Sequence, residues 1–212
     1  MQWTLSSRGL RAGLAAIALA LGAAGFAAPV LADCKQEVAD AFDKQRKMSG
    51  FRLETRMLSE RGPLKMTVDY LLPDRMHQTV KAVIDPTALE TILVGRRAWV
   101  SNGQGWQELP MEDALSISEE MQKQVVKGGG EQPVFDCLGL TDLDGQKVKA
   151  YEAMKDKTAP AGQPTRMVYV DATTGLPVRS IVAQKEKLDR PFFRQDYTYP
   201  QDIRIEQPEV KK

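Results

Sequence analysis

The residues that could carry catalysis are few, and their spacing does not favour an enzyme. His77 is the single histidine, and the alternation over residues 76–82 places it on the polar face of a predicted strand. The sequence has no Gly-x-Ser-x-Gly turn, no His-Glu-x-x-His pair and no calcium-binding loop. Glu119 and Glu120 fall among the polar positions of a predicted helix, and a pair of distant carboxylates stays open as an alternative. We therefore expect a protein that is not an enzyme, with no cofactor and no metal site.

The two cysteines offer either a structural bond or a reactive thiol. Cys34 and Cys137 are the only ones in the chain, and neither belongs to a Cys-x-x-Cys motif. In an oxidising compartment two such cysteines form a disulfide, whose long closed loop stabilises the fold by roughly 4 kcal/mol. We predict a Cys34–Cys137 disulfide, with a redox-active or nucleophilic cysteine as the alternative.

Methionine and tryptophan point to apolar binding or to ordinary core packing. Methionine side chains adapt to irregular apolar ligands, and they also fill cores or bind Cu(I) when they cluster. Eight methionines follow residue 32, and they are scattered along the chain: Met48, Met57, Met66, Met76, Met111, Met121, Met154 and Met167. Trp99 and Trp106 flank a predicted hairpin, where they would line the mouth of a cavity or cover the edge of a sheet.

The first 32 residues read as a secretory leader. Arg8 and Arg11 precede an apolar run over residues 12–28, and small residues over 30–32 suit signal peptidase. We expect cleavage after Ala32, which would leave residues 33–212 as a single soluble periplasmic domain. A lipid anchor on Cys34 is disfavoured, because the charged Asp33 precedes it where a small residue is needed.

Size and charge narrow the class of partner. Without the leader the chain would have 180 residues, with 27 basic against 28 acidic side chains and a net charge of −1. That balance gives no electrostatic reason to bind nucleic acid. A chain of this length can form one domain with its own core, and we expect a monomer.

Two helical segments and about ten strands are predicted to position these residues. Helical spacing covers residues 34–47 and 111–126, and a run of three glycines from Gly128 to Gly130 ends the second helix. That run lacks the Lys-Ser/Thr ending of a phosphate loop. Alternating apolar and polar residues predict strands over 51–58, 64–72, 76–82, 91–101, 106–109, 146–155, 165–171, 177–184, 192–199 and 202–206.

A sheet this wide must bury its apolar face, and two helices are too few to fill it. We therefore predict an α+β, mostly β fold, in which a curved antiparallel sheet forms a half-open barrel. The apolar cavity is expected to be lined by residues on the inward faces of the strands and helices. The candidates are Phe51, Leu53, Met57, Leu64, Met66, Val68, Tyr70, Met76, Val80, Trp99, Leu115 and Met121.

The order of elements resembles the superfamily of periplasmic lipoprotein-sorting and lipid-binding proteins that includes LolA, LolB, LppX and RseB. A helix leads into a strand at Phe51, and a later strand ends in the run Tyr70-Leu-Leu-Pro-Asp-Arg75. The run Val94-Gly-Arg-Arg-Ala-Trp99-Val-Ser-Asn-Gly103 is similar to the family's glycine- and tryptophan-bearing hairpin. The run Val170-Asp-Ala-Thr-Thr-Gly-Leu-Pro177 is similar to its closing hairpin.

This resemblance implies a half-open barrel with the two helices as a lid over an acyl-binding cavity. It implies a periplasmic carrier for a lipid, an acyl chain or a lipid-modified protein, with a membrane or lipoprotein partner. The alternative is an envelope sensor or adaptor that binds a protein through its sheet or lid, in the manner of RseB. The chain departs from the family's lipoprotein shuttles, which do not depend on a disulfide between the first helix and mid-chain.

Overall fold

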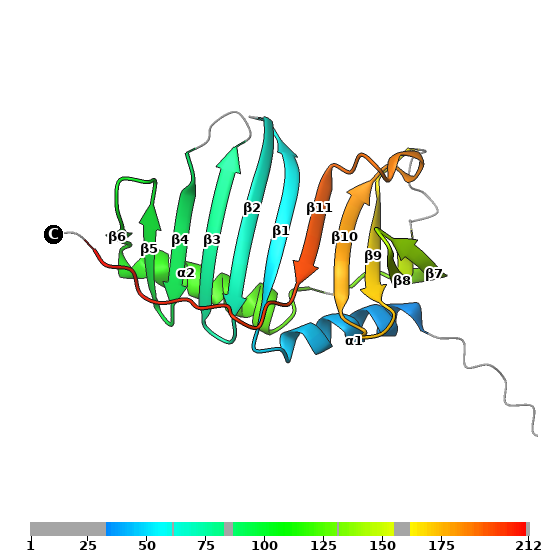
Figure 1. Ribbon diagram of the computed structural model, residues 1–212, viewed down its shortest axis with the longest axis horizontal. Coiled ribbons are helices and arrows are strands. Elements are labelled where there is room, and N and C mark those ends of the chain that lie inside the picture. Colours follow the sequence, from blue (N-terminus) through cyan, green and yellow to red (C-terminus); the bar gives the residue numbers. More distant parts are fainter. Residues whose placement is uncertain (1–32, 61, 83–86, 131, 155–161, 211–212) are drawn as a thin grey trace, which may run out of the picture. The chain divides into compact units, whose positions relative to one another are not determined.

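An open antiparallel sheet with helices on one face makes up the described part of the chain (Figure 1). The computed structural model describes residues 33–60, 62–82, 87–130, 132–154 and 162–210, and the predicted leader lies outside these ranges. Along the chain the elements are α1 (Cys34–Arg46), β1 (Gly50–Ser59), β2 (Gly62–Leu71), β3 (Arg75–Ala82), β4 (Leu89–Val94), β5 (Arg97–Ser101), β6 (Gln107–Glu108), α2 (Met111–Met121), the π-helical turn η1 (Gln122–Val126), β7 (Phe135–Leu143), β8 (Gln146–Ala153), β9 (Thr165–Asp171), β10 (Pro177–Ala183), the 3₁₀ turn η2 (Lys185–Lys187) and β11 (Phe193–Thr198).

The sheet is assembled from two meanders. Its eleven described strands lie in the order β6-β5-β4-β3-β2-β1-β11-β10-β9-β8-β7. The pairing of β1 with β11, with Leu53 opposite Tyr197, joins the two meanders. β6 and β7 form the two edges, so the curved sheet is not closed into a barrel. The predicted fold class, a mostly β half-open barrel with two helices, is confirmed.

Three strand predictions differ from the structure. The predicted strand 91–101 is two strands, because the chain turns back at Gly95, whose φ of 63° suits glycine. Residues 202–206 lie in a described segment that forms no strand. β7 was not predicted, because it is an edge strand in which Phe135 is buried and the next seven residues are exposed.

Helix α1 begins at a capped and covalently fixed end. The carboxylate of Asp33 accepts the backbone N–H groups of Lys35 and Gln36, which satisfies donors that the first helical turn leaves free. The predicted disulfide is present, with the Cα atoms of Cys34 and Cys137 5.5 Å apart. It joins the first turn of α1 to β7. None of the described helices is long and apolar enough to span a bilayer.

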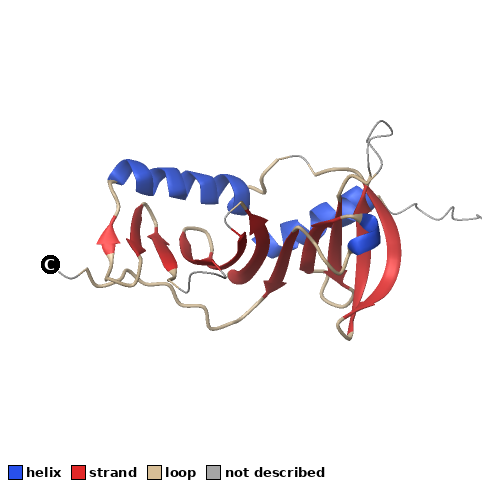
Figure 2. Cartoon of the chain, turned by 90° about the horizontal axis from the view of Figure 1, so that it is seen from above, coloured by secondary structure: helices blue, strands red, loops and turns tan. Residues whose placement is uncertain are grey.

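Each helix buries a separate cluster of the inward sheet face. Under α2 the cluster includes Leu93, Ala98, Ala114 and Met121, all nearly inaccessible. Under α1, the side chains of Val38 and Ala41 pack with Phe135, Tyr151, Val168 and Val170. Figure 2 shows α2 on one side of the sheet and the C-terminal segment on the other. The two halves therefore have separate helix-covered cores.

The outward face is covered by the C-terminal segment. Ile203 and Ile205 pack against a cluster that contains Ile92 and Trp99. Arg75 donates a hydrogen bond from Nη1 to the carbonyl oxygen of Ile205 at 2.9 Å. In Figure 1 this segment crosses strands β1 to β5. Residues that were predicted to form a last strand therefore pack across the sheet rather than pair at its edge.

Glu37 of α1 forms polar contacts with the sheet that should be lost in acid, and the protein should then be less stable. Hydrogen bonds from Lys149 Nζ at 2.8 Å and from the Tyr151 hydroxyl at 2.6 Å lower the pKa of Glu37 below its usual 4.5. The stabilisation from a carboxyl group with a depressed pKa is complete above the unfolded pKa and is lost as the pH falls through the folded pKa. We expect the free energy of unfolding to fall as the pH is lowered from about 5 toward 2, and Glu37→Gln to reduce that fall. Urea unfolding at several pH values measures the pH dependence of the free energy of unfolding.

Glu119→Gln, on the exposed face of α2, is the control. An unchanged pH dependence in Glu37→Gln would contradict the assignment of this acid effect to Glu37.

Candidate functional site

A cavity of about 440 Å³ lies between the part of the sheet covered by α1 and the part covered by α2. Phe42 of α1 packs against both buried clusters, and its ring meets the ring of Tyr197 edge-on at 5.9 Å. Phe51 and Leu53 of β1 also line the cavity, and the Phe51 ring lies 5.0 Å from the ring of Tyr70. These aromatic and aliphatic side chains give the cavity an apolar floor on the central strands β1, β2 and β11.

Polar side chains form the remaining walls. They come from α1, from η1, from the segment after the glycine run and from strands β9 and β11, and they are Gln45, Arg46, Gln124, Gln132, Arg166 and Gln195. The run Gly128–Gly130 completes the lining. Gly128 has a φ of 92°, and a Cβ atom there would lie 2.8 Å from the guanidinium carbon of Arg46. Glycine at this position therefore lets the end of α1 approach the loop that follows η1.

A second hollow of about 440 Å³ adjoins the first beneath α2. Tyr70, Gln124 and Val125 line both hollows. The second hollow adds apolar side chains from β3 and α2, including Met76, Ile117 and Met121. The three shared residues place the two hollows next to each other, one between the helix-covered halves and one beneath α2.

The tyrosines of this region are neutral at physiological pH. Burial raises the pKa of Tyr70 to about 12, and burial likewise raises that of Tyr197 to about 12. The Tyr197 hydroxyl donates to Gln195 Oε1 at 3.0 Å. The floor therefore presents aromatic surface and neutral hydroxyl groups, and the charge in the cavity belongs to its arginines.

The predicted cavity residues occupy several places. Phe51, Leu53 and Tyr70 line the first hollow, while Tyr70, Met76 and Met121 line the second. Val68 is fully buried in the core beneath α2, and Met66 packs against that core. Val80 and Leu115 are half-buried on β3 and α2.

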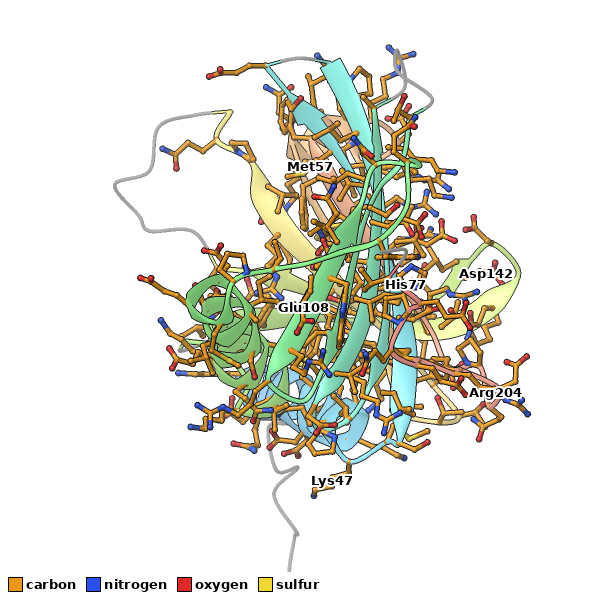
Figure 3. All side chains as sticks on the ribbon, turned by 90° about the vertical axis from the view of Figure 1, so that its left-hand side faces the viewer. Lys47, Met57, His77, Glu108, Asp142 and Arg204 are labelled. Carbon is orange, nitrogen blue, oxygen red and sulfur yellow. A yellow bond between two sulfur atoms is a disulfide. The ribbon has the colours of Figure 1, made fainter. Side chains whose placement is uncertain are left out.

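Met57 and Leu64 lie in a different hollow, near the turn between β1 and β2. It has a volume of about 570 Å³ and also contains Leu58 and Phe192. The Met57 side chain is 39% exposed. Figure 3 shows Met57 in the upper part of the view and Lys47 at the bottom.

The assignment of Trp99 to the cavity is corrected by the structure. Its ring is fully buried on the outward face of β5, against Ile92 and the C-terminal Ile205. The turn at Gly95 pairs Ile92 with Trp99 and Leu93 with Ala98, so Trp99 shares the face of Ile92 rather than that of Leu93. Trp106 is half-buried beside the same cluster.

The histidine and Glu119 line neither hollow. His77 Nε2 is 2.9 Å from Glu90 Oε2, and its ring lies 6.4 Å from the ring of Trp106. Figure 3 shows His77 on the side of the sheet away from α2. Glu119 and Glu120 are exposed on α2, and Glu120 also borders the second hollow beneath that helix. The described residues contain no group of three His, Cys, Asp or Glu side chains that could hold a metal ion.

Most residues that line the first hollow were not predicted from the sequence, among them Phe42, Arg166, Gln195 and Tyr197. Arg166 carried a usable signal, because the alternation of β9 places it on the same face as the buried Val168 and Val170. A cation at an inward strand position is uncommon and points to a special environment. Phe42 and Tyr197 looked like ordinary core residues, and Gln195 had no distinguishing pattern.

Similarity to known proteins is found at the level of structure. No protein-family model and no curated protein matches the sequence. The crystal structure of the Mycobacterium tuberculosis lipoprotein LppX matches with a TM-score of 0.53 at 12% identity, covering 82% of this chain and 98% of that one. LprF from Mycobacterium bovis matches with a TM-score of 0.53 at 13% identity, covering 82% of this chain and 96% of that one. At these identities the likeness shows the fold alone: the chain has the fold of LppX, one of the proteins that its order of elements resembles.

Proposed function

We propose that this protein is a non-catalytic binding or carrier protein of the bacterial periplasm. Its cargo would be a lipid, an acyl chain or a lipid-modified protein, held between α1 and α2. The observation that carries the proposal is the pair of adjoining hollows on the inward sheet face, with a floor of Phe51, Leu53, Tyr70 and Met76. Their volumes are those of sites that enclose small organic ligands.

The covering of the inward face supports this proposal. α1 and α2 each seal their own half with buried apolar side chains, and the space between the two cores is left as a cavity. The disulfide holds α1 against β7, which would keep one wall of the cavity in place. A disulfide of this kind persists in oxidising compartments, which fits a protein outside the cytosol.

A variant that fills the cavity tests this assignment. Val125 of η1 borders both hollows, so Val125→Trp would occupy the space where they meet. We expect this variant to bind the neutral apolar probe N-phenyl-1-naphthylamine at least about tenfold more weakly than the unaltered protein, a loss of about 1.4 kcal/mol. Probe fluorescence during titration measures the affinity.

Val126→Trp is the matched control, because Val126 is the next residue of η1, is half-buried and lines neither hollow. Its affinity for the probe should stay within about twofold of the unaltered protein, a difference of about 0.4 kcal/mol. Equal probe affinity in Val125→Trp and the unaltered protein would place the probe elsewhere. Absence of probe binding to the unaltered protein would contradict the proposed function.

The adaptor alternative is favoured by the sheet edge at β7. In the described part of the chain β7 pairs on one side, with β8, and Leu138 and Leu140 are 52% and 70% exposed. An exposed apolar edge strand can accept a strand from another chain. A photo-crosslinking amino acid at position 140, used in intact cells, would form an adduct of one defined mass if β7 docks a protein. A scatter of weak adducts would argue against the adaptor role.

A further inference from the structure

Arg166 is a cation inside the cavity, and its partners among the described residues are uncharged. Its Nη1 donates to Gln132 Oε1 at 3.1 Å, and its Nε is 3.3 Å from the hydroxyl oxygen of Ser180. Both partners are neutral. Among the described residues, no Asp or Glu oxygen lies within ion-pairing distance of the Arg166 guanidinium, and no acidic side chain lines the first hollow.

Several other arginines on the sheet form ion pairs with carboxylates, which makes Arg166 a contrast within the same fold. Arg52 contacts Asp69 at 2.6 Å, and Arg179 contacts Asp196 at 2.5 Å. Arg46, the other cation of the cavity, pairs with Asp43 one helical turn earlier. The cavity wall therefore holds one guanidinium whose charge the described side chains do not balance.

Burial makes this arrangement costly unless an anion completes it. Removal from water lowers the pKa of Arg166, yet arginine stays charged at any physiological pH. A guanidinium has five N–H donors in a planar fork, and Arg166 directs two of its nitrogens to neutral acceptors. The remaining donors suit the two oxygens of a carboxylate or a phosphate, which accept a guanidinium side by side.

We propose that Arg166 binds the oxyanion of an amphiphilic cargo, a carboxylate or a phosphate ester, while the acyl chain lies on the apolar floor. This inference rests on the proposed function and narrows its cargo from apolar ligands in general to anionic amphiphiles. The amide side chains of Gln124, Gln132 and Gln195 line the same hollow and can donate further hydrogen bonds to the anion. The floor of Phe51, Leu53 and Tyr70 lies in that hollow as well, so one ligand can contact both parts.

The test compares ligands that share an acyl chain and differ in charge. Oleate and the neutral monoolein are each titrated against protein loaded with N-phenyl-1-naphthylamine. A charge-assisted hydrogen bond contributes about 1.5–3 kcal/mol, so we expect oleate to bind about ten- to a hundredfold more tightly than monoolein. In Arg166→Leu the affinity for oleate should fall to that for monoolein, while the affinity for monoolein stays unchanged.

Arg204→Leu is the control, because Arg204 is exposed on the C-terminal segment, on the outward side of the sheet (Figure 3). It should keep the preference for oleate. Should Arg166→Leu fail to fold, equal affinity of the unaltered protein for oleate and monoolein would still overturn the proposal. A salt titration of the same two ligands, weakening oleate and not monoolein, would support the charge contact.

Two further ligands identify the source of the anion. Lysophosphatidic acid that outcompetes oleate, with the same dependence on Arg166, would assign the site to a phosphate headgroup. Inorganic phosphate that displaces oleate on its own would show that a free anion suffices, and would overturn the assignment to an amphiphile. Equal affinity for oleate and monoolein would overturn the role of Arg166 and leave the carrier proposal standing, whereas no binding of either would contradict both.

Discussion

Replacing Cys34 and Cys137 together by serine is expected to lower the free energy of unfolding by about 2–5 kcal/mol. The bond joins residues 103 positions apart, so its loss frees a long loop in the unfolded chain. In the folded protein it fixes the first turn of α1 to β7, an edge strand with few buried side chains of its own. Urea unfolding of the double variant, compared with the oxidised protein, measures the loss.

A second readout separates the role of the bond in α1 from its role in the unfolded chain. If the disulfide holds α1 in place, backbone amides of α1 should exchange with deuterium faster in the double variant. The amides of the central strands β1 and β2 should keep the same ranking from slowest to fastest exchange. The unaltered protein under reducing conditions is the matched comparison, and it should behave as the double variant does. A loss below about 1 kcal/mol would show that the packing of Val38 and Ala41 holds α1 without the bond.

Replacing Trp99 by alanine is expected to lower the free energy of unfolding by about 3–5 kcal/mol. The ring is fully buried between β5 and the C-terminal segment, and the Arg97 guanidinium lies 5.0 Å from the ring centroid. Its removal would leave a cavity beneath Ile205 and loosen the segment that covers the outward face. Thermal and urea unfolding of the variant measure this loss.

Trp106→Ala is the control for the size of the side chain. Trp106 borders the same cluster but is half-buried, so its removal should cost clearly less than that of Trp99. Binding of N-phenyl-1-naphthylamine should be kept in folded Trp99→Ala, because Trp99 lies on the face away from the cavity. Equal losses of stability in the two variants would contradict the placement of Trp99 at the centre of the outward cluster.

Strict alternation was the part of the sequence that predicted structure well. In β1 and β2 the inward residues Leu53 and Val68 are buried and paired across the two strands, as the pattern indicated. Such strands separate a core face from a polar face, and the period of two reports that separation directly. The disulfide was likewise predictable, because two cysteines in a predicted oxidising compartment have one pairing.

The face of the sheet on which Trp99 lies was predicted wrongly because a short turn interrupts the predicted strand. The run 91–101 looked like one strand, in which Trp99 would share the face of Leu93. The turn at Gly95 reverses the chain and pairs Leu93 with Ala98, so Trp99 falls on the other face. A shift of one residue changes the face of every later side chain, and neither composition nor alternation reports it.

The cavity itself depends on how separate elements meet. Phe42 and Tyr197 come from distant parts of the chain, and their edge-on contact is decided by the placement of α1 over the sheet. Alternation alone could identify Arg166 as an inward cation, but it could not show which groups surround it. The neutral partners Gln132 and Ser180 belong to other segments and were found from the structure.

The most direct test of the carrier assignment is native mass spectrometry of the protein purified gently from a periplasm, with lipid extraction of the same sample. We predict a bound mass that matches an extracted amphiphile, and that is lost in Val125→Trp but kept in Val126→Trp. A protein that shows its bare mass, and that stays bare when offered fatty acid, phospholipid and lipopeptide, would contradict it.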